Sequence, residues 1–516
     1  MKLKKQSFVT GALILMISNT ISKILGAVFK IPLTYIIGEE GMAVYNTAFN
    51  IYIMFLSFIV SGLPFAVSKS VSEYSSKNEP HMVRQTVKLS NTILCIAGLI
   101  GSLVLYFGAD FFALAMKEEK AVLAIKMISP SIFLVAAGTT IRSYYQGISN
   151  MIPTAISQVI EAVTKLAVGY VLAVYFIDYG INAASGGAIM GVTIGEAVAT
   201  SVFLVIYIFS SKSNKKCTIL EKKEIRKTLF ELAIPLLCAS VIGSMLSVVD
   251  TTVIRSGLIK SGLSLDDARR VYGSYTGYAL TVFHLPIGIL GTLGVSILPV
   301  IAGNTAIGNT QKASAAAGIA LRLTILFSLP CAVIIYFMSN ELLEILFNNS
   351  AATSMLSMTA PCLIMICVSN ILSSMLQSGG RIISVFLYSA LGMILKIALS
   401  ITLMPRLGIY GAIAAANVSY LPVMIFNLCE AKKHIGLRLS IIEEVIKPIC
   451  AAAVMAIIVY LIKEPFTAWL PNLFIHTAAI CITALAGYGG MLLLLFPTEQ
   501  LRMLIPFKSK NLTNIS

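Results

Sequence analysis

The chain has 516 residues, of which 57% are apolar and only 12% are charged, with a mean hydropathy of +0.88. Soluble globular proteins carry about 25% charged residues, so this composition excludes a water-soluble globule and indicates a membrane protein. The net charge of +15 does not indicate nucleic-acid binding, because the basic residues lie between apolar runs and form no single patch or arm.

Membrane-spanning helices need about 20 mostly apolar residues each. The start of the chain, Met1–Lys5 and then an apolar run, mimics a signal peptide, but the run continues past Phe29 without a small-residue cleavage site. We therefore interpret it as the first span of an all-α polytopic membrane protein with about fourteen spans. In chain order the predicted spans are 8–29, 43–66, 89–109, 122–141, 153–176, 184–209, 231–254, 275–301, 316–338, 352–376, 383–404, 409–429, 446–462 and 473–496.

The basic residues between the spans predict the orientation of the chain. If the N-terminus is cytoplasmic, the cytoplasmic segments hold 24 of the 38 Lys and Arg residues and the external segments hold nine. Several external loops are acidic instead, for example Glu39-Glu40 and Asp266-Asp267. The positive-inside rule then predicts a cytoplasmic (inner) membrane protein with both termini in the cytoplasm.

An internal repeat appears when the chain is shifted by 231 residues against itself. Residues 127–184 then align without a gap, and Pro130, Gln146 and Lys165 meet identical residues, Lys396 being the partner of Lys165. Spans four to six map onto spans ten to twelve in the same direction, which predicts two pseudo-symmetric six-helix lobes and alternating access. The predicted domains are an N-terminal lobe (1–210), a basic cytoplasmic linker (211–230), a C-terminal lobe (231–430), and spans thirteen and fourteen with a cytoplasmic tail (431–516).

The linker bears seven basic residues from Ser210 to Lys227. One interpretation is a hinge that lies partly along the anionic leaflet surface. The other is a plain determinant of topology.

Charged residues within spans are expensive and are therefore candidates for function. In span one, Asn19, Ser22 and Lys23 lie in a polar stripe, which predicts that Lys23 points into a central cavity and binds an anion. The alternative is a lysine that snorkels to a lipid headgroup. Lys30 and Arg255, at the external ends of spans one and seven, either ring a cavity mouth or anchor their helices to headgroups.

Span five places Gln158, Glu161 and Lys165 on one helical face, where Glu161 and Lys165 could form a pair, either functional or purely structural. Gly392 replaces Glu161 in the second repeat, so a carboxylate role would be confined to the first lobe. Glu196 in span six and Asp250 in span seven are further candidates for taking up H⁺ or Na⁺.

No enzyme signature is present. The sequence contains no P-loop, and its four histidines form no HExxH motif, so no ATPase, metal site or cofactor is expected.

The segment after span four resembles a signature of polysaccharide exporters. It reads Arg142-Ser143-Tyr144-Tyr145-Gln146-Gly147, then Met151-Ile152-Pro153-Thr154-Ala155-Ile156-Ser157-Gln158-Val159-Ile160-Glu161. These exporters belong to the multidrug/oligosaccharidyl-lipid/polysaccharide superfamily, and the likeness is greatest to the stage V sporulation protein B group, which is related to MurJ-type lipid II flippases. The family motif residues here are Arg142, Gln146, Gly147, Pro153 and Gln158.

The resemblance implies a flippase for a lipid-linked saccharide, such as lipid II, in cell-wall or spore-cortex synthesis. Lipid II flippases hold the lipid pyrophosphate with cavity cations, and their first-span motif is similar to Ser22-Lys23-Ile24-Leu25-Gly26 here. Their span-two arginine is absent, because Phe55, Leu56 and Ser57 occupy that region. The expected partners are the saccharide lipid, membrane lipids and candidate cell-wall synthesis proteins, and the cycle would be reset by the membrane potential or an H⁺ or Na⁺ gradient.

Three rival functions stay open at this point. A multidrug exporter of the same fold would favour acidic cavity residues over Lys23. A membrane glycosyltransferase or polymerase would not need the repeat. A non-transporting scaffold of a cell-wall complex would tolerate neutralisation of Lys23.

Overall fold

The computed structural model describes residues 8–77, 79–148, 150–210, 219–291, 310–437, 440, 442–470 and 472–496. These residues form two compact units, which are described separately. The first unit comprises Met1–Thr281 with Ser389–Ala415, and the second comprises Val282–Tyr388 with Ala416–Ser516, each within the described ranges.

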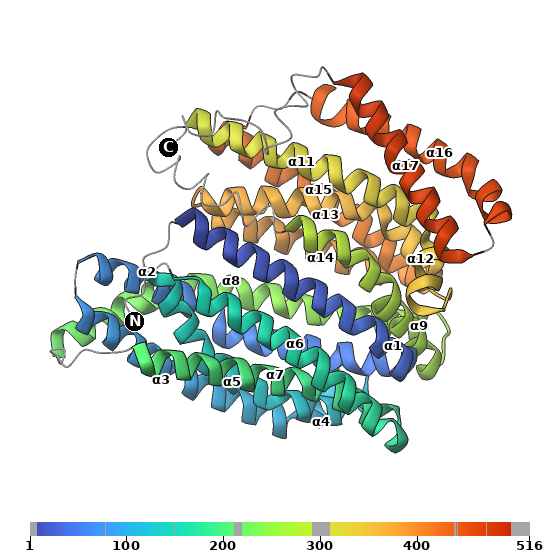
Figure 1. Ribbon diagram of the computed structural model, residues 1–516. Coiled ribbons are helices and arrows are strands. Elements are labelled where there is room, and N and C mark those ends of the chain that lie inside the picture. Colours follow the sequence, from blue (N-terminus) through green and yellow to red (C-terminus); the bar gives the residue numbers. More distant parts are fainter. Residues whose placement is uncertain are drawn as a thin grey trace. The chain divides into compact units, whose positions relative to one another are not determined.

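The first unit is built from long helices that pack side by side (Figure 1). They are α1 (Phe8–Val60), α2 (Leu63–Ser76), α3 (Pro80–Phe107), α4 (Ala109–Ala115), α5 (Val122–Gly147), α6 (Ile152–Phe176), α7 (Ile181–Ser210), α8 (Ile219–Lys260) and α9 (Leu265–Ser274). Short turns η1 (Glu119–Ala121) and η2 (Ile177–Tyr179) and a π-helical turn, η3 (Tyr275–Ala279), connect some of them. The chain stays helical over residues 280–291.

The second unit is also built from helices. Its helices are α11 (Thr310–Phe337), α12 (Ser339–Phe347), α13 (Thr353–Ser378), α16 (Lys447–Trp469) and α17 (Leu473–Leu495), with the π-helical turn η4 (Ile442–Ile446). Helices α14 (Ile382–Leu407) and α15 (Ile409–Ile435) contribute to both units, because the division falls within each of them.

A sharp reversal at Gly38 turns α1 into two antiparallel spans. Gly38 has φ +61° and ψ −168°, a left-handed conformation that glycine adopts without a Cβ penalty. In one straight helix, Phe29 and Tyr45 would lie about 24 Å apart. Their ring centroids are 6.3 Å apart, so the chain folds back on itself between them, as Figure 1 also shows. The predicted first and second spans are therefore the two arms of this hairpin.

The all-α polytopic fold class is confirmed. Twelve described segments are long and apolar enough to cross a membrane, and one of them, Ile17–Ser75, contains both arms of the α1 hairpin. Span eight (275–301) is helical as far as residue 291, and its last ten residues lie outside the described part of the chain. About fourteen spans is thus consistent with the structure.

The predicted linker is partly a helix. Residues 211–218 lie outside the described part, but α8 begins at Ile219 and runs on into span seven. Ile225 and Leu229 are buried against Val67, Val71 and other apolar side chains of α2 and α3. The second half of the linker therefore packs against the protein and does not lie free on a leaflet surface.

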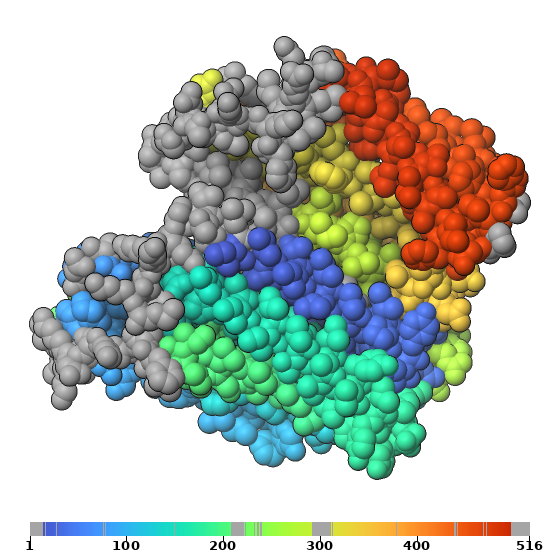
Figure 2. Space-filling model, viewed as in Figure 1, coloured from blue at the N-terminus to red at the C-terminus, as the bar shows by residue number. Residues whose placement is uncertain are grey.

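The apolar core of the first unit surrounds the α1 hairpin. Phe29, Leu33 and Tyr45 are fully buried there with side chains from α5 and α7. Glycines allow the closest approach of α6 and α7, since a Cβ on Gly191 would lie 2.4 Å from the Cα of Gly169. Figure 2 shows α1, α6 and α7 as adjacent bands on the visible face of this unit.

In the second unit, one ion pair lies just before the start of α16 and another lies near its end. Arg322 of α11 reaches Glu444 at 3.1 Å, and Lys463 of α16 reaches Glu341 of α12 at 2.8 Å. Between them Met455 and Val459 pack against α11 and α17. Spans thirteen and fourteen are therefore integral to this unit.

Candidate functional site

A polar pocket of about 210 Å³ lies between α1, α5 and α6 in the first unit. It brings together residues from the predicted anion stripe, the predicted coupling group and the family motif. Its lining residues are Asn19, Ser22, Gly26, Phe29, Arg142, Gln158, Glu161, Ala162 and Lys165. The sequence alone did not predict that these three groups share one site.

Gln158 joins α1 to α6 at the pocket wall. The Ser18 hydroxyl donates to Gln158 Oε1 at 3.1 Å, and the Ser22 hydroxyl donates to the Gln158 backbone carbonyl at 3.1 Å. Ser18 and Ser22 of span one therefore face α6, as the polar stripe predicted.

Arg142, and not Lys165, is the ion-pair partner of Glu161. Arg142 Nη2 lies 3.6 Å from Glu161 Oε2, and its guanidinium lies over the Phe203 ring at 5.6 Å. The predicted pairing of Glu161 with Lys165 is therefore wrong, because α5 brings a guanidinium to the carboxylate. Behind this pair, Glu196 of α7 is 8% exposed and interacts electrostatically with Glu161, Arg142 and Lys165.

The ammonium of Lys165 contacts aromatic rings, whereas the Glu196 carboxyl group acts on it from beyond ion-pair distance. Lys165 Nζ lies 5.1 Å from the centroid of the Phe49 ring and 6.0 Å from that of Phe29. Cation–π contacts of this kind stabilise a desolvated ammonium by about 2 kcal/mol or more. Within the described part of the chain, no carboxylate lies within ion-pair distance of Lys165.

Lys23 and Lys30 lie on α1 beside the pocket. Lys23 follows Ser22 directly and is exposed, whereas Lys30 follows the pocket residue Phe29 and is half-buried. Lys30 and Lys165 repel each other electrostatically. The first unit thus gathers several cations along one region of its first span.

Arg255 is buried and does not reach a headgroup or an open mouth. It is 3% exposed, and its Nη1 lies 2.9 Å from Glu118 Oε2. It also donates to the Thr47 hydroxyl at 2.6 Å and stacks over the Tyr272 ring at 4.5 Å. Both interpretations of Arg255 from sequence need an accessible guanidinium, and this environment provides none.

Asp250 and Lys396 form an ion pair that sequence reasoning missed. Lys396 Nζ donates to Asp250 Oδ2 at 2.5 Å, and the two side chains are only 15% and 11% exposed. They are 146 residues apart, so spacing could not indicate the contact. The Asp250 carboxylate is therefore already paired with a cation of the protein itself, the ammonium of Lys396.

The remaining motif residues lie where α5 ends and α6 begins, outside the pocket lining. Gly147 ends α5 where a Cβ would lie 2.7 Å from the Ser68 carbonyl oxygen, so it permits close packing on α2. Pro153 occupies the first turn of α6, where its missing N–H costs no hydrogen bond. Gln146 lies half-buried in the last turn of α5.

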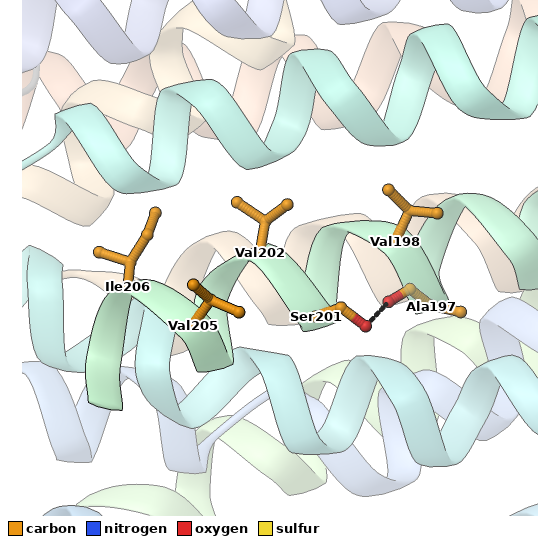
Figure 3. Close-up of a pocket in the computed structure, with 6 residues that line it drawn as sticks. All are labelled: Ala197, Val198, Ser201, Val202, Val205 and Ile206. Carbon is orange, nitrogen blue, oxygen red and sulfur yellow. Dashed lines mark hydrogen bonds between the residues drawn. The ribbon is translucent and has the colours of Figure 1, made fainter. Parts of the chain in front are cut away.

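A second, larger hollow of about 420 Å³ lies along α7 (Figure 3). Val198, Val202 and Ile206 follow one side of the helix. The Ser201 hydroxyl, which also lines it, donates to the Ala197 carbonyl at 2.8 Å. Its lining therefore offers no group for a charged ligand, unlike the polar pocket.

The model of the family described as polysaccharide biosynthesis protein matches residues 8–305, more than half of the chain. This chain belongs to that family. A second model, described as MatE, matches residues 274–402.

Two relatives from Bacillus subtilis (strain 168) extend the similarity of this family member over most of its length. It is 27% identical to stage V sporulation protein B over 85% of this chain and 86% of that protein. It is 24% identical to lipid II flippase MurJ over 93% of each chain.

Solved structures show the same fold. A lipid II flippase MurJ in an inward closed conformation superposes with a TM-score of 0.67 at 18% identity, over 93% of this chain and 98% of that one. An inward-facing multidrug resistance MATE family transporter gives a TM-score of 0.66 at 14% identity, over 82% and 98%. The polysaccharide biosynthesis family member described here is therefore a multi-pass membrane protein of the multidrug/oligosaccharidyl-lipid/polysaccharide superfamily.

Proposed function

We propose that this protein flips a lipid-linked saccharide, a polyprenyl diphosphate of the lipid II kind, across the cytoplasmic membrane by alternating access. The observation that carries the proposal is the polar pocket of the first unit, whose lining contains two cations, Arg142 and Lys165, and one carboxylate, Glu161. The lining side chains alone carry one net positive charge, which favours an anion, and Glu196 lies behind them. A diphosphate carries the negative charge that such a site requires. The lipid tail would stay in the bilayer and needs no site in the pocket.

Lys23 and Lys30 extend this positive region along α1. Lys23 is exposed beside the pocket and would meet the diphosphate as the headgroup enters, with Asn19 as a hydrogen-bond donor. We leave Arg255 out of the binding site, because Glu118 already neutralises it. Lysine supplies a compact charge here in place of the bidentate fork of an arginine.

We assign the coupling of transport to a proton gradient to Glu161 and Glu196. Asp250 is occupied by the ammonium of Lys396, which leaves these two carboxyl groups, with Arg142 beside them, as the acidic groups next to the pocket. Two carboxyl groups that share one guanidinium can exchange a proton as the pocket opens and closes. A proton gradient would then drive the return of the empty carrier.

The test is translocation of lipid II in reconstituted vesicles. Wild type should move lipid II, Lys23→Ala should reduce the rate about tenfold or more, and the matched variant Lys126→Ala should not. Lys126 also lies in an apolar span but pairs with Asp110 at 3.5 Å, away from the pocket. If folded wild type moves neither lipid II nor another polyprenyl-diphosphate saccharide, the proposed substrate class is wrong.

The same vesicles separate the rival functions. An exporter of organic cations is the second candidate, because the Glu161 and Glu196 carboxyl groups could hold a cation. Efflux of a fluorescent organic cation that depends on Glu161, without lipid translocation, would favour it. A scaffold would transport neither compound and would support cell-wall synthesis even with Lys23→Ala.

A further inference from the structure

The repeated lysine has different surroundings in the two halves of the chain. Lys165 of α6 and Lys396 of α14 are partners in the 231-residue repeat, and each lies within a membrane-spanning helix. Lys396 is neutralised by Asp250, which comes from α8, the first span of the second half. The corresponding helix of the first half is the first arm of α1.

The first arm of α1 carries no acid at the position of Asp250. Residues 8–38 contain no Asp or Glu, so the absence of an acid holds in any register, and extending the 231-residue shift to this arm places Asn19 opposite Asp250. Asn19 lines the polar pocket together with Lys165, as expected if the two pairs are equivalent. The first half has therefore kept the lysine and has an uncharged residue where the second half has the aspartate.

No carboxylate of the described residues lies within ion-pair distance of this intramembrane ammonium, although the Glu196 carboxyl group interacts with it electrostatically. Lys165 contacts the rings of Phe29 and Phe49, which hold the ammonium in place but do not neutralise it. Lys30 adds a second positive charge that repels Lys165. An intramembrane charge without a contact ion pair is costly, and two like charges near each other add to that cost. An anion bound between them would relieve both costs.

We propose that Lys165 is the primary anion-binding residue of the pocket and that a phosphate group of the ligand takes the place that Asp250 holds in the second half. Lys30 supplies the second cation, and Asn19 donates a hydrogen bond. The inference deepens the proposed function and rests on it for the source of the phosphate, a polyprenyl diphosphate. It moves the main phosphate contact from Lys23 to Lys165.

Binding of farnesyl diphosphate to the purified full chain in detergent, followed by titration calorimetry, tests the inference. Farnesol is the uncharged control, and inorganic pyrophosphate distinguishes a lipid-linked from a free anion. Wild type should bind farnesyl diphosphate and not farnesol. Lys165→Gln should weaken binding about thirtyfold or more, since it removes one partner of a desolvated charge pair, and Lys165→Arg should retain it.

Asn19→Asp is the sharper variant, because it rebuilds in the first half the ion pair of the second half. It should weaken binding as strongly as Lys165→Gln while raising the thermal stability of the chain. The matched control is the double variant Asp250→Asn with Lys396→Gln, which removes the equivalent pair without leaving a charge behind and should bind as wild type does.

The results discriminate the inference from the proposed function. Binding that requires Lys165, without translocation of any saccharide lipid, would support this site and refute the flippase. Unchanged binding in Lys165→Gln and Asn19→Asp, or a wild type that binds neither diphosphate, would overturn the inference. Full translocation by Lys165→Gln would also overturn it while leaving the flippase intact.

Discussion

Arg255 Nη1 lies 2.9 Å from Glu118 Oε2, and the two side chains are only 4% and 1% exposed. Glu118 also accepts a hydrogen bond from Arg269 Nε at 2.7 Å, so one buried carboxylate contacts two guanidinium groups. These contacts join the loop after α4 to α8 and α9. Asp266 also pairs with Arg269, at 2.5 Å, so it is the buried Arg255 whose charge balance depends on Glu118.

Replacing Glu118 with glutamine should destabilise the protein strongly. Removing one partner of a buried pair costs about 3–5 kcal/mol, because the remaining charge stays buried without compensation. We expect a large fall in the thermal unfolding midpoint of the purified protein in detergent. Glu73→Gln is the control, since Glu73 pairs with Lys77 on an exposed surface, and no measurable change is expected there. Equal midpoints for the two variants would contradict the structural role of Glu118.

Gly38→Ala should destabilise the α1 hairpin. At φ +61° an L-residue pays about 1 kcal/mol or more, although no side chain lies close enough to clash. Gly243 is the matched control, because it lies inside α8 with equally open space around it. Gly243→Ala should be neutral or stabilising by up to about 1 kcal/mol. Chemical unfolding in mixed micelles measures both, and a neutral Gly38→Ala would count against the reversal.

Gly273→Ala tests the contact between α9 and the tip of the hairpin. A Cβ there would lie 1.9 Å from the backbone oxygen of Glu39, which cannot move aside as a flexible side chain could. Overpacking of this kind costs about 1–3 kcal/mol. Gly318→Ala in α11 meets nothing within 4 Å and should leave the unfolding midpoint nearly unchanged. If the two variants have the same unfolding midpoint, the close approach of Gly273 to the Glu39 backbone is wrong.

Tyr272 should make the protein sensitive to alkaline pH. Burial raises the pKa of the Tyr272 hydroxyl above its usual value, and the side chain is 2% exposed. Since the folded-state pKa is raised, the contribution to stability is complete below about pH 10, the pKa of an unfolded tyrosine, and is lost as pH rises through the folded value. Tyr272→Phe should therefore reduce the fall of the unfolding midpoint above pH 10. Tyr179→Phe, at a 73% exposed tyrosine, should leave that fall unchanged.

The sequence by itself determined the properties that depend on composition and local pattern. Long apolar runs predicted an all-α membrane protein, because the bilayer core leaves few other ways to satisfy the backbone. The polar stripe at Asn19 and Ser22 predicted a face of span one turned toward protein, and both residues line the pocket. The segment from Arg142 to Glu161 indicated the family that the comparison then showed.

Only the tertiary structure decided which charges meet. Spacing on one helix favoured Glu161 with Lys165, yet a guanidinium from another helix holds the carboxylate. Arg255 appeared accessible near a helix end, but Glu118 from a distant loop buries and neutralises it. Asp250 and Lys396 meet across 146 residues. Helical periodicity specifies which face a residue occupies, whereas the partner of an intramembrane charge depends on which helices pack together, and that is a property of the folded chain.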